Sequence, residues 1–168
     1  EAAADALAGQ LAALGFEVRG YARTPRSIEG VATFAGSDQL AAFADGLDIV
    51  VSVLPLTPET TGIMNAGFFG MLADGAFIIN GGRGPQVDDD DLLAALDSGK
   101  IGGAALDVFA VEPLPQDHPF WTHPKVRVWP HVAAQTNATS AAEQVAAAIT
   151  AMMDGSEPAN RVDWSRGY

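Results

Sequence analysis

The 168-residue sequence predicts an α/β protein built on a doubly wound parallel sheet. Two observations lead to this fold class. Strand-like runs alternate with helix-like segments along nearly the whole chain. Residues 47–56 (LDIVVSVLPL) form an almost uninterrupted apolar run rich in β-branched residues, which is typical of a strand covered on both faces. No internal repeat or low-complexity segment interrupts this alternation.

The first part of the chain predicts three helices and a short strand. Residues 1–15 (EAAADALAGQLAALG) have helical composition, and the final glycine ends the helix as a C-terminal cap. Residues 16–21 (FEVRGY) form a short strand. A polar stretch and a helix are expected before residues 31–36 (VATFAG). Residues 37–46 (SDQLAAFADG) then form a helix that begins at their serine.

The second part continues the alternation up to an irregular tail. The four aspartates 88–91 lie at a predicted helix start, where the helix dipole favours negative charge, and Gly99 follows the last turn of that helix. We interpret these aspartates as a solvated helix start rather than a ligand site. The elements expected here are a short helix over 66–72, a strand over 76–80, a helix over 88–99, strands over 101–109 and 126–130, and a last helix over 137–154.

Composition excludes several classes of function. The formal net charge is −12, which disfavours binding to nucleic acid or to an anionic membrane surface. The sequence has no cysteine, so it offers neither disulfides nor thiolate ligands, and no residues are spaced as metal ligands. It has no apolar run of the length that spans a membrane and no secretion signal. We expect a cytoplasmic protein that binds no metal.

Three polar motifs follow predicted strands, where a parallel sheet binds its ligand. The motif NGGRG contains Arg83, the motif LDVFAVEPLP contains Asp107 and Glu112, and the motif VWPHVAAQT contains His131. Each residue taken alone has a plainer interpretation: Arg83 as a solvated loop residue, Glu112 as a surface carboxylate, and His131 as a structural histidine. The three motifs together, in this order, favour a catalytic site.

With the segment SVLPLTPETTG (52–62), these motifs resemble the D-isomer-specific 2-hydroxyacid dehydrogenases. The segments HPFWTHPKV (118–126) and NRVDWSRGY (160–168) are most similar to the glyoxylate/hydroxypyruvate reductase branch of that family. The resemblance covers essentially the whole chain. It implies a Rossmann-type NAD(P)-binding domain, reduction of a small 2-oxoacid to the D-2-hydroxyacid by hydride transfer, and a homodimer.

The resemblance also implies a role for each motif residue. Arg83 would hold the carboxylate of the oxoacid and polarise its carbonyl, a task that suits a planar and permanently charged guanidinium. His131 would donate a proton to the carbonyl oxygen as the hydride arrives. Glu112 would pair with His131, orient its ring and favour its charged form.

Other residues would contact the cofactor. Asp107 would lie beside the nicotinamide carboxamide, residues 54–56 would line the adenine side, and the backbone of 82–84 would face the cofactor. Glycines in this turn allow close approach of the backbone while the arginine reaches the substrate. The complete predicted cofactor set is Arg23, Thr24, Arg26, Leu54, Pro55, Leu56, Thr60, Gly82, Arg83, Asp107, His131 and Ala133.

The segment GYARTPR indicates NADP rather than NAD. NAD-selective domains carry an Asp or Glu at the end of the second strand, but Ala22 stands there, and Arg23, Thr24 and Arg26 follow. Two guanidiniums can bind a 2'-phosphate. The alternative is a pair of solvent-facing arginines near a helix start, so NAD also stays possible.

Two other functions fit the same fold. One is a non-catalytic, nucleotide-sensing binding protein, which would have no need of a proton donor. The other is a dehydrogenase for a different D-2-hydroxyacid, such as phosphoglycerate, or for formate. His118, Trp121 and His123 lie in a proline-broken loop, and we expect them to serve loop packing.

The dinucleotide-binding sheet has the strand order 3-2-1-4-5-6, with its first strand in the centre. That strand, its glycine-rich turn and an upstream substrate domain are missing from this chain, so we expect the natural polypeptide to continue upstream. Residues 1–154 would then be the dinucleotide-binding domain, incomplete at its N-terminus, and residues 155–168 a tail returning to the substrate domain. A polypeptide beginning at Glu1 is expected to have negligible activity.

Overall fold

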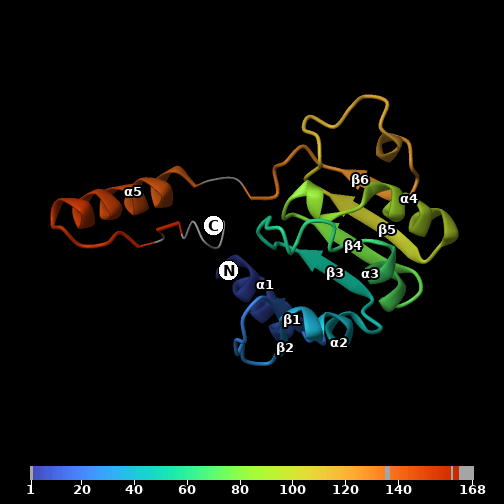
Figure 1. Ribbon diagram of the computed structural model, residues 1–168, viewed down its shortest axis with the longest axis horizontal. Coiled ribbons are helices and arrows are strands. Elements are labelled where there is room, and N and C mark those ends of the chain that lie inside the picture. Colours follow the sequence, from blue (N-terminus) through green and yellow to red (C-terminus); the bar gives the residue numbers. More distant parts are fainter. Residues whose placement is uncertain (1, 135–136, 160, 163–168) are drawn as a thin grey trace. The chain divides into compact units, whose positions relative to one another are not determined.

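A computed structural model describes residues 2–134, 137–159 and 161–162 (Figure 1). The chain separates into two compact units, residues 1–130 and residues 131–168. The larger unit contains every strand among the described residues, and the smaller unit contains one helix. The units are described separately below.

A four-stranded parallel sheet forms the centre of the larger unit, in the order β3-β4-β5-β6. The strands are β3 (Ile49–Ser52), β4 (Ala76–Asn80), β5 (Ile101–Leu106) and β6 (Val126–Val128). Their last residues are register partners from strand to strand: Ser52 pairs with Asn80, Asn80 with Leu106, and Leu106 with Val128. The loops that follow the four strands therefore leave the sheet along one edge.

Helices α2 (Leu40–Ala44), α3 (Ala66–Met71) and α4 (Asp89–Ser98) contribute to the core beside this sheet. Asn65 caps α3 by accepting a hydrogen bond from the amide of Phe68 at 3.2 Å. Gly99 ends α4 at φ 83, in the left-handed region that glycine adopts without strain. The fully buried side chains of this core include Ile78, Leu92, Leu96 and Ile101.

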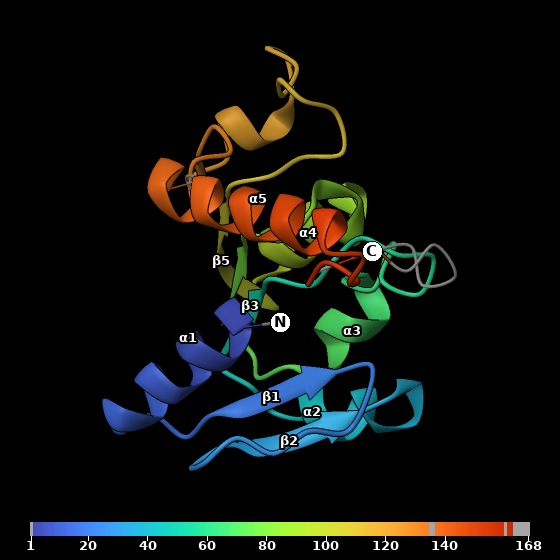
Figure 2. The ribbon, with the colours of Figure 1, turned by 90° about the vertical axis from the view of Figure 1, so that its left-hand side faces the viewer.

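Two further strands, β1 (Arg19–Ala22) and β2 (Ala32–Ala35), pair in parallel beside α2 (Figure 2). The guanidinium of Arg19 donates to the carbonyls of Phe43 and Asp45, at 3.3 and 2.8 Å, near the C-terminal end of α2. These carbonyls have no partner within the helix, so the arginine satisfies them and attaches β1 to α2. Helix α1 (Ala2–Ala13) precedes β1. The parallel strands separated by helices confirm the predicted fold class.

Two local predictions were wrong, and a third differs from the structure in detail. No helix forms over residues 23–30, where the chain makes bends and a turn, because Pro25 and Gly30 interrupt any helical run. The helical segment predicted to begin at Ser37 does begin there, but its first turn is a 3-10 turn, Ser37–Gln39, whose N-cap is Gly36, and α2 follows directly. Within the larger unit, β3 is covered on one face only, since its side chains alternate between exposed and buried.

The open face of the central strands is apolar. Ile49 and Val51 of β3 are 51% and 37% exposed, and Phe77 and Ile79 of β4 are 52% and 39% exposed. Helix α1 lies instead near the loop before β2, where its Asp5 pairs with Arg26. The β-branched run of β3 therefore predicted its strand correctly but not its coverage.

In the smaller unit, α5 (Ala138–Met153) begins at Asn137, whose side chain accepts hydrogen bonds from the amides of Thr139 and Ser140. The predicted helix over 137–154 is thus confirmed. Residues 160 and 163–168 of the predicted tail lie outside the described residues. Among the helices that the structure describes, none has the length and apolar character needed to cross a membrane.

Candidate active site

The candidate site lies at the carboxyl edge of the four-stranded sheet. Three consecutive loops leave this edge after Ser52, Asn80 and Leu106, which are register partners. These loops contain the predicted residues of the larger unit except those that follow β1. The sheet therefore brings together segments that are 25 or more residues apart in sequence, as parallel sheets do at ligand sites.

The backbone of Arg83 is held on both sides by buried side-chain amides. Its N–H donates to Oε1 of Gln86 at 3.1 Å, and its carbonyl accepts from Nδ2 of Asn80 at 3.2 Å. Asn80 is 1% exposed and Gln86 is 0% exposed. Arg83 itself is exposed, and its Nη1 donates to the carbonyl of Gly82 at 2.6 Å. The buried amides of Asn80 and Gln86 therefore fix the backbone of the turn, while the side chain of Arg83 is exposed to solvent.

The two glycines beside Arg83 are required by close packing. A Cβ added at Gly82 would lie 2.5 Å from Oε1 of Gln86, and one added at Gly84 would lie 1.8 Å from the carbonyl carbon of Phe109. The second contact is between backbones, so no side chain fits at position 84. The glycines predicted to approach a cofactor are thus needed first for contact between two loops of the protein.

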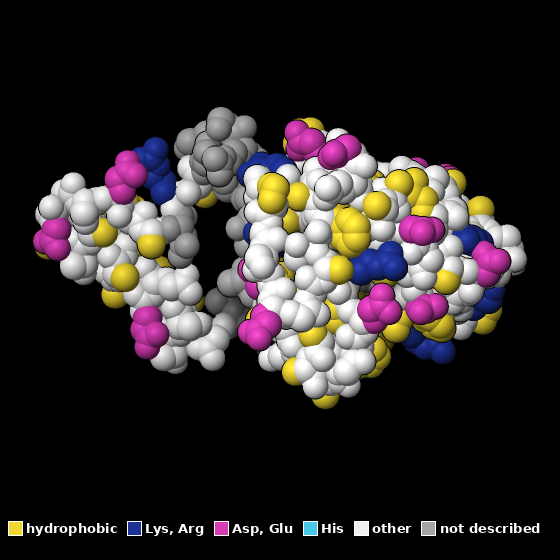
Figure 3. All heavy atoms as spheres, turned by 90° about the horizontal axis from the view of Figure 1, so that it is seen from below, with side chains coloured by type: hydrophobic (Ala, Val, Ile, Leu, Met, Phe, Trp, Pro, Cys, Tyr) yellow, Lys and Arg dark blue, Asp and Glu magenta, His cyan; other side chains and the backbone are white. Residues whose placement is uncertain are grey.

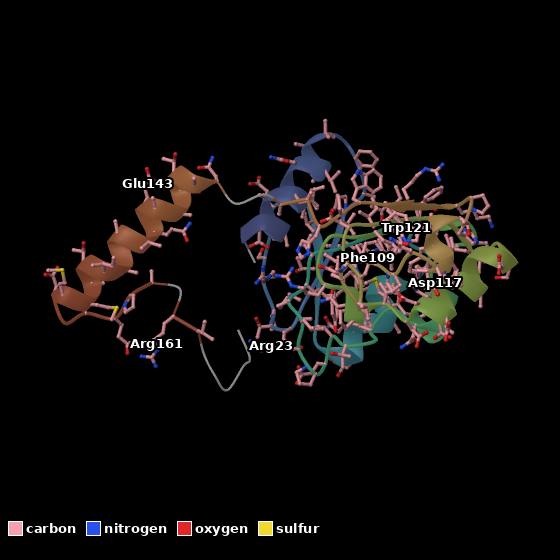
Figure 4. The ribbon with its side chains drawn as sticks, turned by 90° about the horizontal axis from the view of Figure 1, so that it is seen from above. Arg23, Phe109, Asp117, Trp121, Glu143 and Arg161 are labelled. Carbon is pink, nitrogen blue, oxygen red and sulfur yellow. The ribbon has the colours of Figure 1, made fainter. Side chains whose placement is uncertain are left out.

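Through that contact the Arg83 turn meets the segment that holds Asp107 and Glu112. Asp107 is 7% exposed, and its amide donates to the carbonyl of Asn80 at 3.0 Å. Oε1 of the exposed Glu112 accepts a hydrogen bond from the amide of Phe109 at 2.9 Å. Figure 4 labels Phe109, the residue that both Gly84 and Glu112 contact. One carboxylate oxygen of Glu112 therefore shapes its own loop.

The loop after β3 is folded by its threonines. Thr60 Oγ1 donates to the carbonyl of Pro55 at 2.7 Å and accepts from the amide of Thr57 at 2.8 Å. Gln86 joins this loop to the Arg83 turn, since its Nε2 donates to the carbonyls of Leu54 and Pro55 at 2.9 and 3.0 Å. Gln86 is a residue of the site that the sequence did not reveal.

The predicted 2'-phosphate residues follow β1. Arg23 and Thr24 are exposed, and Arg23 is labelled in Figure 4. Hydrogen bonds from Thr57 and from its own backbone lower the pKa of Glu59, and the charge of Arg23 adds to this effect. Arg23 is therefore close enough to the loop after β3 to act on one of its carboxylates.

Arg26 is less accessible than Arg23. Its Nη1 lies 2.6 Å from Oδ1 of Asp5, and the arginine side chain is 22% exposed against 44% for the aspartate. It also lines a hollow of about 240 Å³ together with Thr33, Phe34 and Gln39. Arg26 is thus already ion-paired, so a phosphate would have to compete with Asp5.

His131 and Ala133 belong to the smaller unit and are both exposed. His131 has φ 56 and is the only described residue other than glycine in the left-handed region. Such backbone conformations occur preferentially at functional positions.

The aspartates interpreted as a helix start have structural roles at the start of α4. The carboxylate of Asp88 caps α4 by accepting from the amide of Asp91 at 3.0 Å, and burial raises the pKa of Asp89, which lies 3.6 Å from His118. Asp91 does more than expected, since it accepts from the amide of Ala66 at 2.8 Å and so links α4 to α3.

The loop histidine and tryptophan have local partners. His123 lies 3.4 Å from Asp97, and Trp121 Nε1 donates to the carbonyl of Pro115 at 2.8 Å. Within residues 2–134, 137–159 and 161–162, no three histidine, aspartate or glutamate side chains form a group that could hold a metal. On the face of the larger unit seen in Figure 3, acidic side chains are interspersed with basic and exposed hydrophobic ones.

Comparison with known proteins identifies the family of this domain. Residues 2–133 match the model of the family "D-isomer specific 2-hydroxyacid dehydrogenase, NAD binding domain". The chain is 50% identical over 162 residues to glyoxylate/hydroxypyruvate reductase A of Serratia proteamaculans, covering 96% of this chain and 52% of that protein. The same named protein of Yersinia enterocolitica is 49% identical over 162 residues. The chain thus spans about half the length of the curated relatives it matches.

Solved structures give the same result. A D-isomer specific 2-hydroxyacid dehydrogenase from Xanthobacter autotrophicus, in complex with NADPH and MES, superposes with a TM-score of 0.94 at 48% identity, covering 97% of this chain and 67% of that one. An NADPH-dependent glyoxylate/hydroxypyruvate reductase from Sinorhizobium meliloti, in complex with NADP and sulfate, has a TM-score of 0.93 at 41% identity, covering 98% and 53%. The chain belongs to the D-isomer-specific 2-hydroxyacid dehydrogenase family and represents its Rossmann-type NAD-binding domain.

Proposed function

We propose that the whole protein reduces a small 2-oxoacid, glyoxylate or hydroxypyruvate, to the D-2-hydroxyacid with NADPH as the preferred reductant. The observation that carries this proposal is the contact of Gly84 with Phe109. It joins the turn that contains Arg83 to the loop that contains Glu112, and a carboxylate-binding, proton-handling site would need these two residues close together. The relatives named as reductases support the choice of substrate.

Arg83 would bind the oxoacid carboxylate through its planar fork and draw charge from the carbonyl. His131 would give a proton to the carbonyl oxygen. Glu112 would orient the imidazole and favour its protonated form. The nicotinamide, when bound, supplies the hydride. A pure nucleotide-binding module would need no such proton donor.

The residues present fit a dinucleotide with a 2'-phosphate. Ala22 leaves no carboxylate at the end of β1 to repel it, and the exposed Arg23 with Thr24 offers donors there. Arg26 would add a second guanidinium after leaving Asp5. Leu54, Pro55, Leu56 and Thr60 would serve the cofactor from the loop after β3. Asp107, Ala133 and the backbone of Gly82 would complete its contacts.

Further assignments extend this proposal to the whole protein. Residues 1–154 would serve as the dinucleotide-binding domain and residues 155–168 as a segment that returns to a substrate domain. The active form would be a cytoplasmic homodimer.

The test is oxidation of NADPH and of NADH by the whole protein, with glyoxylate and with hydroxypyruvate. Faster turnover with NADPH is expected. Faster turnover with NADH would retain the reductase and reject the cofactor preference. Turnover only with phosphohydroxypyruvate or another 2-oxoacid would change the substrate. Cofactor binding without any turnover would replace the proposal with a nucleotide-sensing protein.

A further inference from the structure

Gln86 is the residue at which the two loops of the candidate site meet. It lies at the end of the 3-10 turn η2 (Gly84–Gln86) and is 0% exposed. A completely buried glutamine must satisfy four hydrogen-bonding positions, two as donor and two as acceptor, because each one left unmade is costly.

All four positions are filled by the two site loops and by the last residue of β3. Oε1 accepts from the amide of Arg83 at 3.1 Å and from the hydroxyl of Ser52 at 3.2 Å. Nε2 donates to the carbonyls of Leu54 and Pro55 at 2.9 and 3.0 Å. The acceptor end of one side chain therefore fixes the Arg83 turn, and its donor end fixes the loop after β3.

The glutamine is itself anchored through its backbone. The amide of Met64 donates to the carbonyl of Gln86 at 2.9 Å, and the amide of Asp88 donates to the carbonyl of Met64 at 3.0 Å. Gly82 must be a glycine for the side chain to lie where it does, since an added Cβ would approach Oε1 to 2.5 Å. The backbone thus fixes the amide in place before any ligand binds.

Asn80 provides a useful contrast. Its side chain contacts the carbonyl of Arg83 and the amide of Gly82, both in the same turn. Of these two side-chain amides, only that of Gln86 also binds the loop after β3. Loss of Asn80 would loosen one loop, whereas loss of Gln86 would uncouple two.

We propose that Gln86 is a positioning residue that couples the cofactor loop, Leu54–Pro55, to the substrate-binding arginine, Arg83. This rests on the proposed function, in which the first segment contacts the cofactor and the second binds the oxoacid. Gln86 acts through the backbone of both and touches neither ligand. Loss of Gln86 therefore weakens both cofactor binding and oxoacid binding. Loss of a residue that serves only one ligand weakens the binding of that ligand alone.

The test compares three variants of the whole protein with the wild type. Gln86→Met keeps the length of the side chain and removes all four hydrogen bonds. Gln86→Glu keeps the acceptor for Arg83 and places a carboxyl against two carbonyl oxygens. Ser52→Ala is the matched control, because it removes one bond to the same buried oxygen without releasing either loop. The readouts are the Kd of NADPH by fluorescence, the KM of the oxoacid at saturating NADPH, and Tm.

For Gln86→Met, the Kd of NADPH and the KM of the oxoacid both rise by roughly five- to tenfold, the effect of losing about one net hydrogen bond at each loop. For Gln86→Glu the Kd of NADPH rises while the oxoacid KM changes less, and this Kd worsens as pH rises because an ionised carboxylate repels the two carbonyls. The Ser52→Ala values stay within about twofold of wild type.

Folded Gln86→Met protein with wild-type Kd and KM, even with a lowered Tm, would overturn the proposal by showing that Gln86 serves stability alone. If Gln86→Met does not fold, Gln86→Glu decides: a pH-independent Kd of wild-type size overturns it. A wild type that binds NADPH but reduces no 2-oxoacid rejects the proposed reaction, while the Kd comparisons still decide the role of Gln86 at the cofactor loop. A wild type that does not bind NADPH overturns both.

Discussion

The backbones of Gly84 and Phe109 are packed against each other, so that a Cβ at position 84 would lie 1.8 Å from the carbonyl carbon of Phe109. This contact joins the loop after β4, which contains Arg83, to the loop after β5, which contains Glu112. Neither loop can move away without separating the two residues that the proposed reaction needs together. The geometry of the site therefore requires a residue without a Cβ at position 84.

Gly84→Ala should accordingly abolish most activity. The methyl group must displace backbone rather than a flexible side chain, which costs on the order of 1 to 3 kcal/mol or more in stability. We expect kcat/KM for the oxoacid to fall at least tenfold, with a lower Tm. Gly70→Ala in α3 is the control, since a Cβ there meets nothing within 4 Å and alanine favours the helix. Equal effects of the two substitutions would contradict the packing argument.

Arg83→Lys should separate substrate binding from cofactor binding. Lysine keeps the charge but loses the planar fork that binds a carboxylate through two hydrogen bonds. The KM of the oxoacid should rise by roughly ten- to a hundredfold, the effect of about 1.5 to 3 kcal/mol, while the Kd of NADPH changes little. Arg127→Lys, at an exposed arginine of β6, should change neither value. An unchanged oxoacid KM in Arg83→Lys would remove Arg83 from the substrate site.

The ion pair of Arg26 with Asp5 should affect the preference for NADPH over NADH. If Arg26 binds the 2'-phosphate, Arg26→Gln raises the KM of NADPH by about tenfold and leaves that of NADH nearly unchanged. Asp5→Asn removes the competing carboxylate, so the KM of NADPH should fall by roughly two- to fivefold, as expected for a partly exposed pair.

Asp45→Asn, at an exposed aspartate after α2, is the control for Asp5→Asn. It should leave both cofactors unaffected. An NADPH-to-NADH ratio that does not respond to Arg26→Gln would show that Arg26 serves α1 rather than the cofactor.

The four aspartates at the start of α4 should contribute unequally to stability. Asp88→Ala removes the N-cap hydrogen bond to the amide of Asp91 and should cost about 1 kcal/mol, which lowers Tm by roughly 2 to 4 °C. Asp90→Ala, two residues on and exposed, should change Tm by less than about 1 °C. Thermal unfolding followed by circular dichroism measures both. Equal losses would mean that general charge at the helix start, and not the cap, stabilises α4.

Much of the fold could be predicted because its signals are local. The strand over 76–80 and the cap at Gly99 follow from apolar runs and from glycine at a helix end, and both are confirmed. The helix expected before residues 31–36 does not form, because proline and glycine in that segment interrupt any helical run. The exposed face of β3 could not be predicted, since a β-branched run indicates a strand but not what packs against it.

The candidate site shows the same division. Arg83, Asp107 and Glu112 could be located from motifs placed after predicted strands, and the loops that contain them do meet at one edge of the sheet. Gln86 could not be located, because its side-chain partners other than Arg83 lie more than 30 residues away and its neighbours in sequence give no periodic signal. Its role depends on burial, which only the folded chain reveals.

The proposed reaction is tested most directly by identifying the product that the whole protein forms from hydroxypyruvate and NADPH and by determining its chirality. We predict stoichiometric oxidation of NADPH with formation of D-glycerate. Formation of L-glycerate would contradict the proposed D-stereochemistry. Absence of NADPH oxidation with every 2-oxoacid supplied would contradict the proposal that Arg83, Glu112 and His131 serve the reduction of a 2-oxoacid.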